Sequence, residues 1–150
     1  MDQEKLRGRL RKASLVIGPV DETVPKWIEN CTTPIGFVAF DLDYYSSTKA
    51  ALQVFNGAAS THLPRVICYL DDLACTDIGV MNRYVGVYAA VDEFNEQFDD
   101  RKLCPIEKLR NNRPCWEIWQ ERMYGFHNFS HELYKVHVLP TGEEYQQLHL

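Results

Sequence analysis

Two continuous apolar runs, each followed by aspartate, dominate the pattern of hydrophobic and polar positions. Ile35–Phe40 precedes Asp41, and Arg65–Leu70 precedes Asp71 and Asp72. An apolar run that does not alternate with polar residues is typical of a strand buried on both faces of a parallel sheet. The pattern therefore predicts two neighbouring parallel strands that carry acidic residues at their carboxyl ends.

Helical patterns follow each of these strands. A helix is predicted over Ser47–Phe55, with Ser46 and Ser47 as candidate N-caps. A second is predicted over Arg83–Phe98, where apolar residues recur at spacings of four, three and four: Val87, Val91, Phe94 and Phe98. The order strand, helix, strand, helix predicts βαβ units and an α/β fold.

The flanking segments are less regular. Before the first run, we predict a helix over Glu4–Ala13, a short buried strand over Leu15–Ile17, and a helix over Thr23–Asn30 with Pro25 in its first turn. The last third suggests three further strands: Leu103–Leu109, Trp116–His127 and Leu133–Leu139. A tail is predicted after Pro140. We interpret 1–150 as one domain, with a βαβα core over 14–100 and C-terminal strands over 101–150.

Composition narrows the function classes. A net charge of −5 over 150 residues argues against a nucleic-acid partner, and the basic residues between Arg7 and Lys12 suit a solvated helix face. The five cysteines are widely spaced and form no CxxC pair, so neither a disulfide framework nor a zinc ribbon is expected. No apolar run reaches membrane-spanning length. We therefore expect a cytoplasmic protein without a membrane partner.

The candidate chemistry lies in Asp41, Asp43, Asp71 and Asp72. The ends of adjacent strands lie about 5 Å apart, and ligands of open parallel sheets bind at this edge. Carboxylates that close repel one another unless a cation or protons compensate, and an all-oxygen set suits Mg²⁺ or Ca²⁺. The alternative is that each aspartate caps the following helix or points to solvent.

Three kinds of enzyme use strand-end acids in this way. Phosphatases of the haloacid dehalogenase type have a strand ending in DxD and a later strand ending in DD, but they need a long insertion and a lysine between the two. A glycosyltransferase DxD is a second option, supported here by the dipeptide spacing alone. The third is a methyltransferase, for which the match extends over several segments.

Four segments of the sequence carry this match: Gly18–Pro25, Asp41–Thr48, Leu70–Asp72 and Gly86–Phe94. They resemble segments of the class I S-adenosylmethionine-dependent methyltransferases of the macrocin O-methyltransferase group. That group carries, in order, G-x-F-x-D/E-T-L-P, D-x-D-x-Y-x-S-T, a strand ending in D-D-Y, and a helix with G-x-x-x-A-V-D-E-F. The resemblance covers about Leu15 to Phe98, and its most specific part is the second segment.

The resemblance implies a Rossmann-like sheet and a site for Mg²⁺, which would hold the hydroxyls of a small molecule or sugar. Its ligands would be Asp41, Asp71 and Asp72, and the substrate pocket would include Asp43, Tyr44 and Tyr45. The residues that would contact S-adenosylmethionine are Gly18, Val20, Asp21 and Asp41. Leu73 replaces the family's D-D-Y aromatic, and Val20 replaces the phenylalanine of its first segment.

The glycine-rich turn that holds this cofactor in the family is absent from the sequence. We therefore expect a sheet without the family's first two strand–helix units, little or no S-adenosylmethionine binding, and an exposed apolar sheet edge. Two interpretations stay open. One is an O-methyltransferase or a truncated remnant of one; the other is a non-catalytic binding or assembly module, whose edge is covered by a second copy or a partner chain.

Two further residue pairs are candidates for a functional role. His127 and His131 are four residues apart, a spacing that would place both on one helix face, and we expect packing rather than metal binding. Trp116 and Trp119 are expected to pack in the interior, and the alternative is that they line a substrate pocket. The sequence does not identify a general base or the substrate.

Overall fold

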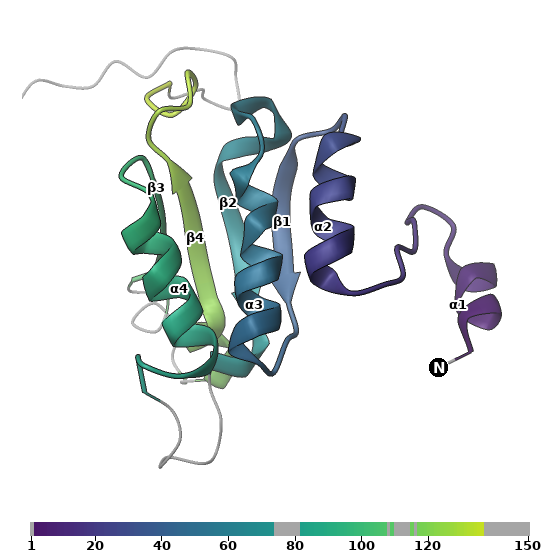
Figure 1. Cartoon of the computed structure of the whole chain (residues 1–150). Coiled ribbons are helices and arrows are strands. Elements are labelled where there is room, and N and C mark those ends of the chain that lie inside the picture. The colour runs from purple at the N-terminus through teal and green to yellow at the C-terminus, as the bar shows by residue number, and fades with distance from the viewer. Residues whose placement is uncertain (1, 74–81, 108, 110–114, 116, 137–150) are drawn as a thin grey trace, which may run out of the picture.

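A four-stranded mixed sheet forms the centre of the protein (Figure 1). The structure is a computed structural model that describes residues 2–73, 82–107, 109, 115 and 117–136. The strand order is β1-β2-β4-β3. The strands are β1 (Ile35–Phe40), β2 (His62–Leu70), β3 (Arg101–Pro105) and β4 (Met123–Asn128).

The first two strands confirm the predicted parallel pair. β1 has the predicted bounds and pairs in parallel with β2, which begins three residues earlier than predicted. α3 (Tyr45–Leu52) and a short 3-10 helix, η1 (Gln53–Asn56), follow β1 and lead back toward the start of β2. Phe40 is level with Leu70 across the pair, so the acidic residues that follow both strands emerge at one edge.

The other two strands are shifted from their predicted positions. β3 starts at Arg101, ahead of the predicted strand, and pairs antiparallel with β4. The predicted strand from residue 116 is a 3-10 helix, η5 (Ile118–Arg122), followed by β4, and residue 116 itself lies outside the described residues. Residues 133–136 lie in turns rather than a strand, while 137–139 and the tail lie outside the described residues.

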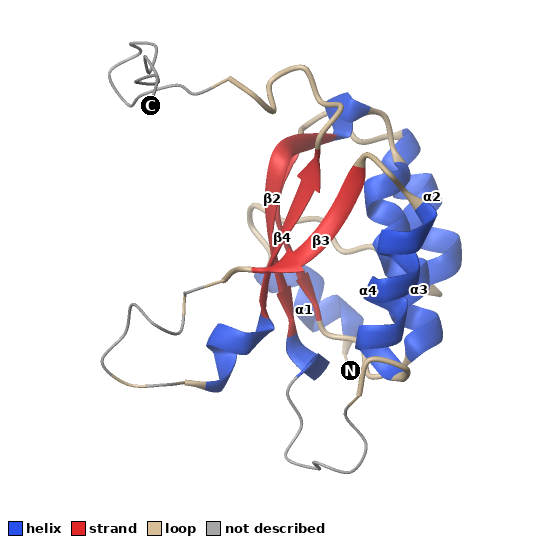
Figure 2. Cartoon of the chain, turned by 90° about the vertical axis from the view of Figure 1, so that its left-hand side faces the viewer, coloured by secondary structure: helices blue, strands red, loops and turns tan. Residues whose placement is uncertain are grey.

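Three helices cover one face of the sheet (Figure 2). They are α2 (Val20–Glu29), α3 and α4 (Gly86–Gln97). Between them and the sheet lies the core, where the Phe55 ring stacks on Phe126 with 3.9 Å between centroids and both rings are fully buried. The predicted inward positions Val87, Val91 and Phe94 of α4 are buried.

The opposite face of the sheet is open, so the expectation of burial on both faces is wrong. Phe37 is 59% exposed and Ile67 is 41% exposed, and the two are paired neighbours on this face. The sequence was misleading because a continuous apolar run does not specify on which side the connecting helices pack. Among the described residues, α2, α3 and α4 all pack on the same side.

The N-terminal predictions need several corrections. α1 (Gln3–Arg9) is shorter than predicted and buries no residue. Leu15–Ile17 forms no strand, and Val16 is 55% exposed, because no described strand lies beside this segment to pair with it. α2 starts before Thr23, so Pro25 falls inside the helix rather than in its first turn.

Two helix starts also differ from the prediction. Tyr44 occupies the N-cap position of α3, and the hydroxyl of Ser47 donates to the Tyr44 carbonyl from within the helix. α4 begins at Gly86, whose φ of 56° lies in the left-handed region that glycine adopts readily. No described helix combines the length and apolar character that crossing a membrane would require.

Candidate functional site

Three aspartates meet at the carboxyl edge of β1 and β2, as predicted. Asp41 directly follows β1, and Asp71 and Asp72 directly follow β2. One carboxylate oxygen from each lies within 4.8 Å of those of the other two. Asp41 is exposed, whereas Asp71 and Asp72 are half-buried. The parallel register of the two strands is what brings these groups together.

The surroundings of Asp72 in this acidic cluster disfavour its ionised form. Its Oδ2 atom is buried and has no hydrogen-bond partner among the described residues. Burial raises the pKa of Asp72, and the negative charges of Asp43, Asp71 and Asp41 raise it further. Ionisation of all these groups is unfavourable without a compensating cation. Three carboxylates around one point therefore fit a hard divalent cation.

Asp71 is held by two groups that the sequence did not identify as site residues. The Tyr69 hydroxyl lies 2.7 Å from Asp71 Oδ1, and Arg122 Nη1 lies 2.9 Å from the Tyr69 hydroxyl. Arg122 also forms an ion pair with Asp71 Oδ1. The signal that places Arg122 here is the register of β4, which cannot be read from one sequence.

The loop between β1 and α3 is held by hydrogen bonds from the side chain of Thr48, which is fully buried. Its hydroxyl lies 2.9 Å from the Tyr44 carbonyl and 3.3 Å from the Leu42 carbonyl. Asp43 lies in this loop and adds its charge to the surroundings of Asp72. The loop geometry thus places Asp43 beside the cluster, as predicted.

The predicted pocket tyrosines behave differently from each other. Tyr44 is 72% exposed, whereas the Tyr45 hydroxyl donates to Glu93 of α4. Glu93 also pairs with Lys49 at 2.7 Å, which ties α3 to α4. A groove of about 490 Å³ opens between the starts of these helices, and its lining is Tyr45, Tyr84, Val85, Gly86, Ala89 and Glu93.

The predicted cofactor residues are only partly brought together. Val20 and Asp41 line a mainly apolar groove of about 300 Å³ between α2, β1 and α3. Val20 and Asp21 line a second groove of about 240 Å³ at the start of α3. Gly18 lies in the segment before α2, with a φ of 149°.

These residues do not fit S-adenosylmethionine as a complete site. Such a cofactor needs backbone amides presented by a glycine turn between a strand and a helix. Among the described residues, the glycines with positive φ are Gly18 and Gly86, and neither directly follows a strand. The acidic cluster, in contrast, has the donor set that Mg²⁺ requires.

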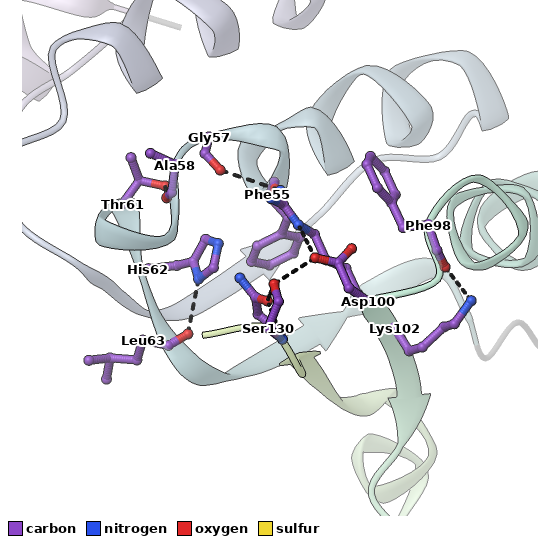
Figure 3. A network of polar contacts seen from close by, with 12 residues as sticks. Phe55, Gly57, Ala58, Thr61, His62, Leu63, Phe98, Asp100, Lys102 and Ser130 are labelled. Carbon is purple, nitrogen blue, oxygen red and sulfur yellow. Dashed lines mark hydrogen bonds and ion pairs between the residues drawn. The ribbon is translucent and has the colours of Figure 1, made fainter. Parts of the chain in front are cut away.

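A second polar network lies near the amino-terminal end of β2 (Figure 3). The Arg101 guanidinium donates to the carbonyls of Phe55 and Gly57, and Ser130 lies 2.7 Å from an Asp100 oxygen. His62 is buried beside this network, and its Nδ1 lies 3.1 Å from the Leu63 carbonyl. These contacts join η1, β3 and the end of β4, so we interpret them as structural.

His127 and His131 do not share a helix face, so that prediction is wrong. His127 lies in β4, and His131 lies in the turns that follow it. His127 Nδ1 is 2.8 Å from the Tyr134 hydroxyl, and its ring stacks on Phe129. Of the two tryptophans predicted to pack in the interior, Trp119 is half-buried and Trp116 lies outside the described residues.

No protein-family model, curated protein or solved structure matches this chain. The assignment of a function therefore depends on the residues and their geometry. What the structure provides is an α/β domain with a mixed open sheet and an acidic cluster at the carboxyl edge of its parallel strands.

Proposed function

We propose that this chain binds Mg²⁺ through Asp41, Asp71 and Asp72 and uses it to hold the hydroxyls of a small molecule. The observation that carries this proposal is the approach of three carboxylates within 4.8 Å. The buried Oδ2 of Asp72 supports it, because this oxygen has no hydrogen-bond partner among the described residues. Repulsion between the acids gives the site a reason to bind a cation.

The finer proposal is that this site corresponds to the metal half of the site in an S-adenosylmethionine-dependent O-methyltransferase with a Rossmann-like sheet, whose cofactor half the described residues do not complete. The sequence resemblance described above supports it, and so does the position of the acids at the sheet edge where such folds bind ligands. A bound Mg²⁺ would supply Lewis-acid stabilisation of a hydroxyl that loses its proton. The protein's own contribution would be to hold the acids in place and to offer the groove beside Tyr45 to the rest of the substrate.

Cation binding can be tested by titrating the purified protein with MgCl₂ in a calorimeter. We expect binding in the wild type and its loss in the double variant Asp71→Asn/Asp72→Asn. Asp99→Asn is a matched control, because exposed Asp99 precedes β3 at the opposite end of the sheet. Equal Mg²⁺ affinity in the wild type and the double variant would overturn the proposed site.

The methyl donor gives a separate measurement. Because the described residues do not form a complete cradle for it, we expect little or no heat when S-adenosylmethionine is titrated into the Mg²⁺-loaded protein. Micromolar affinity would show that the grooves around Val20 accept this cofactor without a glycine-rich turn. Neither result changes the interpretation of the Mg²⁺ titration.

A second candidate function, a non-catalytic assembly module, is favoured by the exposed edge of the sheet. β1 is an edge strand without a charged residue, and Phe37 on it is 59% exposed. Unprotected apolar edges of this kind pair readily with other strands. Light scattering after size exclusion should then show an oligomer that Phe37→Lys converts to monomer, whereas a wild-type monomer would argue against this function.

A further inference from the structure

Arg122 contacts the acidic cluster although it is 51 residues away from Asp71 in sequence. It is the last residue of η5, and β4 begins at the next position. Met123 pairs with Tyr69 across the sheet, so Arg122 falls beside the end of β2. Its side chain is only 18% exposed, and its guanidinium meets both the Tyr69 hydroxyl and Asp71 Oδ1.

This contact puts a permanent positive charge against a group of aspartates. A guanidinium stays protonated at any ordinary pH. In the absence of a cation, its charge offsets part of the repulsion among the carboxylates, so it favours the folded state. Both contacts to Asp71 use Oδ1, so we expect Oδ2 to be the oxygen that faces a cation.

The same charge acts in the opposite direction once a cation binds. Arg122 then lies close to a divalent ion of the same sign, and the repulsion between them reduces the affinity. Tyr69 keeps the guanidinium in this position because its hydroxyl accepts from Arg122 and donates to Asp71. The residue therefore stabilises the empty site and weakens the occupied one.

We propose that Arg122 sets the affinity of the acidic cluster for its cation, as a built-in counter-charge that keeps binding reversible. The inference rests on the proposed cation site and assigns the residue that tunes it. A purely structural role, in which Arg122 only fastens η5 to β2, makes a different prediction. Replacing it would then lower stability equally with and without Mg²⁺ and would leave the affinity unchanged or weaker.

The test compares Mg²⁺ affinity and thermal unfolding in four proteins at neutral pH and an ionic strength of about 0.1 M: wild type, Arg122→Gln, Arg122→Lys and Arg65→Gln. Arg65 is a matched control on β2, about 20 Å from the cluster and therefore beyond the screening length of about 10 Å at this ionic strength. We expect Arg122→Gln to bind Mg²⁺ about tenfold more tightly than the wild type. Its unfolding midpoint should fall without Mg²⁺ and recover at saturation.

The control variants test whether the charge of Arg122 is what changes the Mg²⁺ affinity. Arg122→Lys retains the charge and should bind within about threefold of the wild type, and Arg65→Gln should bind as the wild type does. If Arg122→Gln does not fold, Tyr69→Phe provides a second measurement. It keeps the aromatic ring but removes the hydroxyl that holds the guanidinium, so binding should tighten by about threefold, less than the loss of the whole charge would give.

The outcomes separate this inference from the proposed function. Mg²⁺ binding by the wild type, with equal or weaker binding by Arg122→Gln or Tyr69→Phe, overturns the role of Arg122 and leaves the cation site standing. Absence of Mg²⁺ binding in every variant overturns the cation site and the role of Arg122 with it. Tighter binding together with recovery of the midpoint supports both.

Discussion

At the scale of single residues, His62 makes the clearest prediction for pH dependence. It is 1% exposed, its Nε2 has no hydrogen-bond partner among the described residues, and burial lowers its pKa. Since the unfolded state then takes up the proton more readily, stability is complete above a pH of about 6.5 and falls as the pH drops below it. Urea unfolding from neutral to mildly acidic pH should show a loss of up to about 1.4 kcal/mol per pH unit from this group.

The control for His62 is a pair of substitutions. His62→Leu should reduce the fall in the free energy of unfolding at acidic pH, because the leucine side chain cannot bind a proton. His127→Gln should remove a smaller part, because His127 is half-buried and its pKa is also lowered by burial. If the stability of His62→Leu falls with acid as steeply as that of the wild type, His62 is not the source of the pH dependence.

The acids of the candidate site could be predicted from the sequence, whereas their supporting residues could not. Asp41, Asp71 and Asp72 follow apolar runs, and parallel pairing alone is enough to bring them together. Arg122 and Tyr69 join them only because β4 runs antiparallel to β2 in one particular register. Register depends on tertiary pairing, which leaves no mark at fixed spacing along a single chain.

At the scale of elements, the stack between Phe55 and Phe126 is the expected centre of stability. Phe55 belongs to η1 and Phe126 to β4, and their rings lie 3.9 Å apart and nearly parallel. Phe55→Ala should destabilise the protein by about 3–5 kcal/mol, because a fully buried ring leaves a cavity that the sheet cannot close. Equilibrium unfolding in urea, followed by circular dichroism, gives the difference.

Phe37 provides a matched control, because it is also a phenylalanine in the same sheet but lies on the open face. Phe37→Ala should cost less than about 1 kcal/mol, since most of its ring remains in water in the folded protein. Equal costs for the two substitutions would mean that the open face is covered in solution. That result would favour the assembly module.

The elements themselves were predicted with uneven success, for a physical reason. β1, β2 and α4 carry strong apolar patterns, and all three are present close to their predicted positions. Leu15–Ile17 has an equally apolar sequence but forms no strand, because a strand needs a neighbour for its backbone hydrogen bonds. Periodicity identifies a segment that could be buried, and pairing decides whether it is.

At the scale of the whole molecule, stability should be distributed unevenly along the described chain. α1 buries no residue, Val16 and Ile17 are exposed, and no described strand pairs with this segment. β2 lies between β1 and β4, and its residues Val66, Cys68 and Leu70 are fully buried. Regions with few buried contacts open at low free energy, whereas central strands open only on global unfolding.

Hydrogen exchange read by mass spectrometry should resolve this difference. We expect amides of residues 3–17 to exchange within the earliest measurable times, and amides of β2 and β4 to exchange last, at rates set by global unfolding. Saturating Mg²⁺ should slow the β2 and β4 amides by about a hundredfold when the ion is present at a hundred times its dissociation constant, and should leave residues 3–17 unchanged. Slow exchange in residues 3–17 would instead mean that this segment is paired in solution. The open edge of β1 would then be the first place to look for its partner.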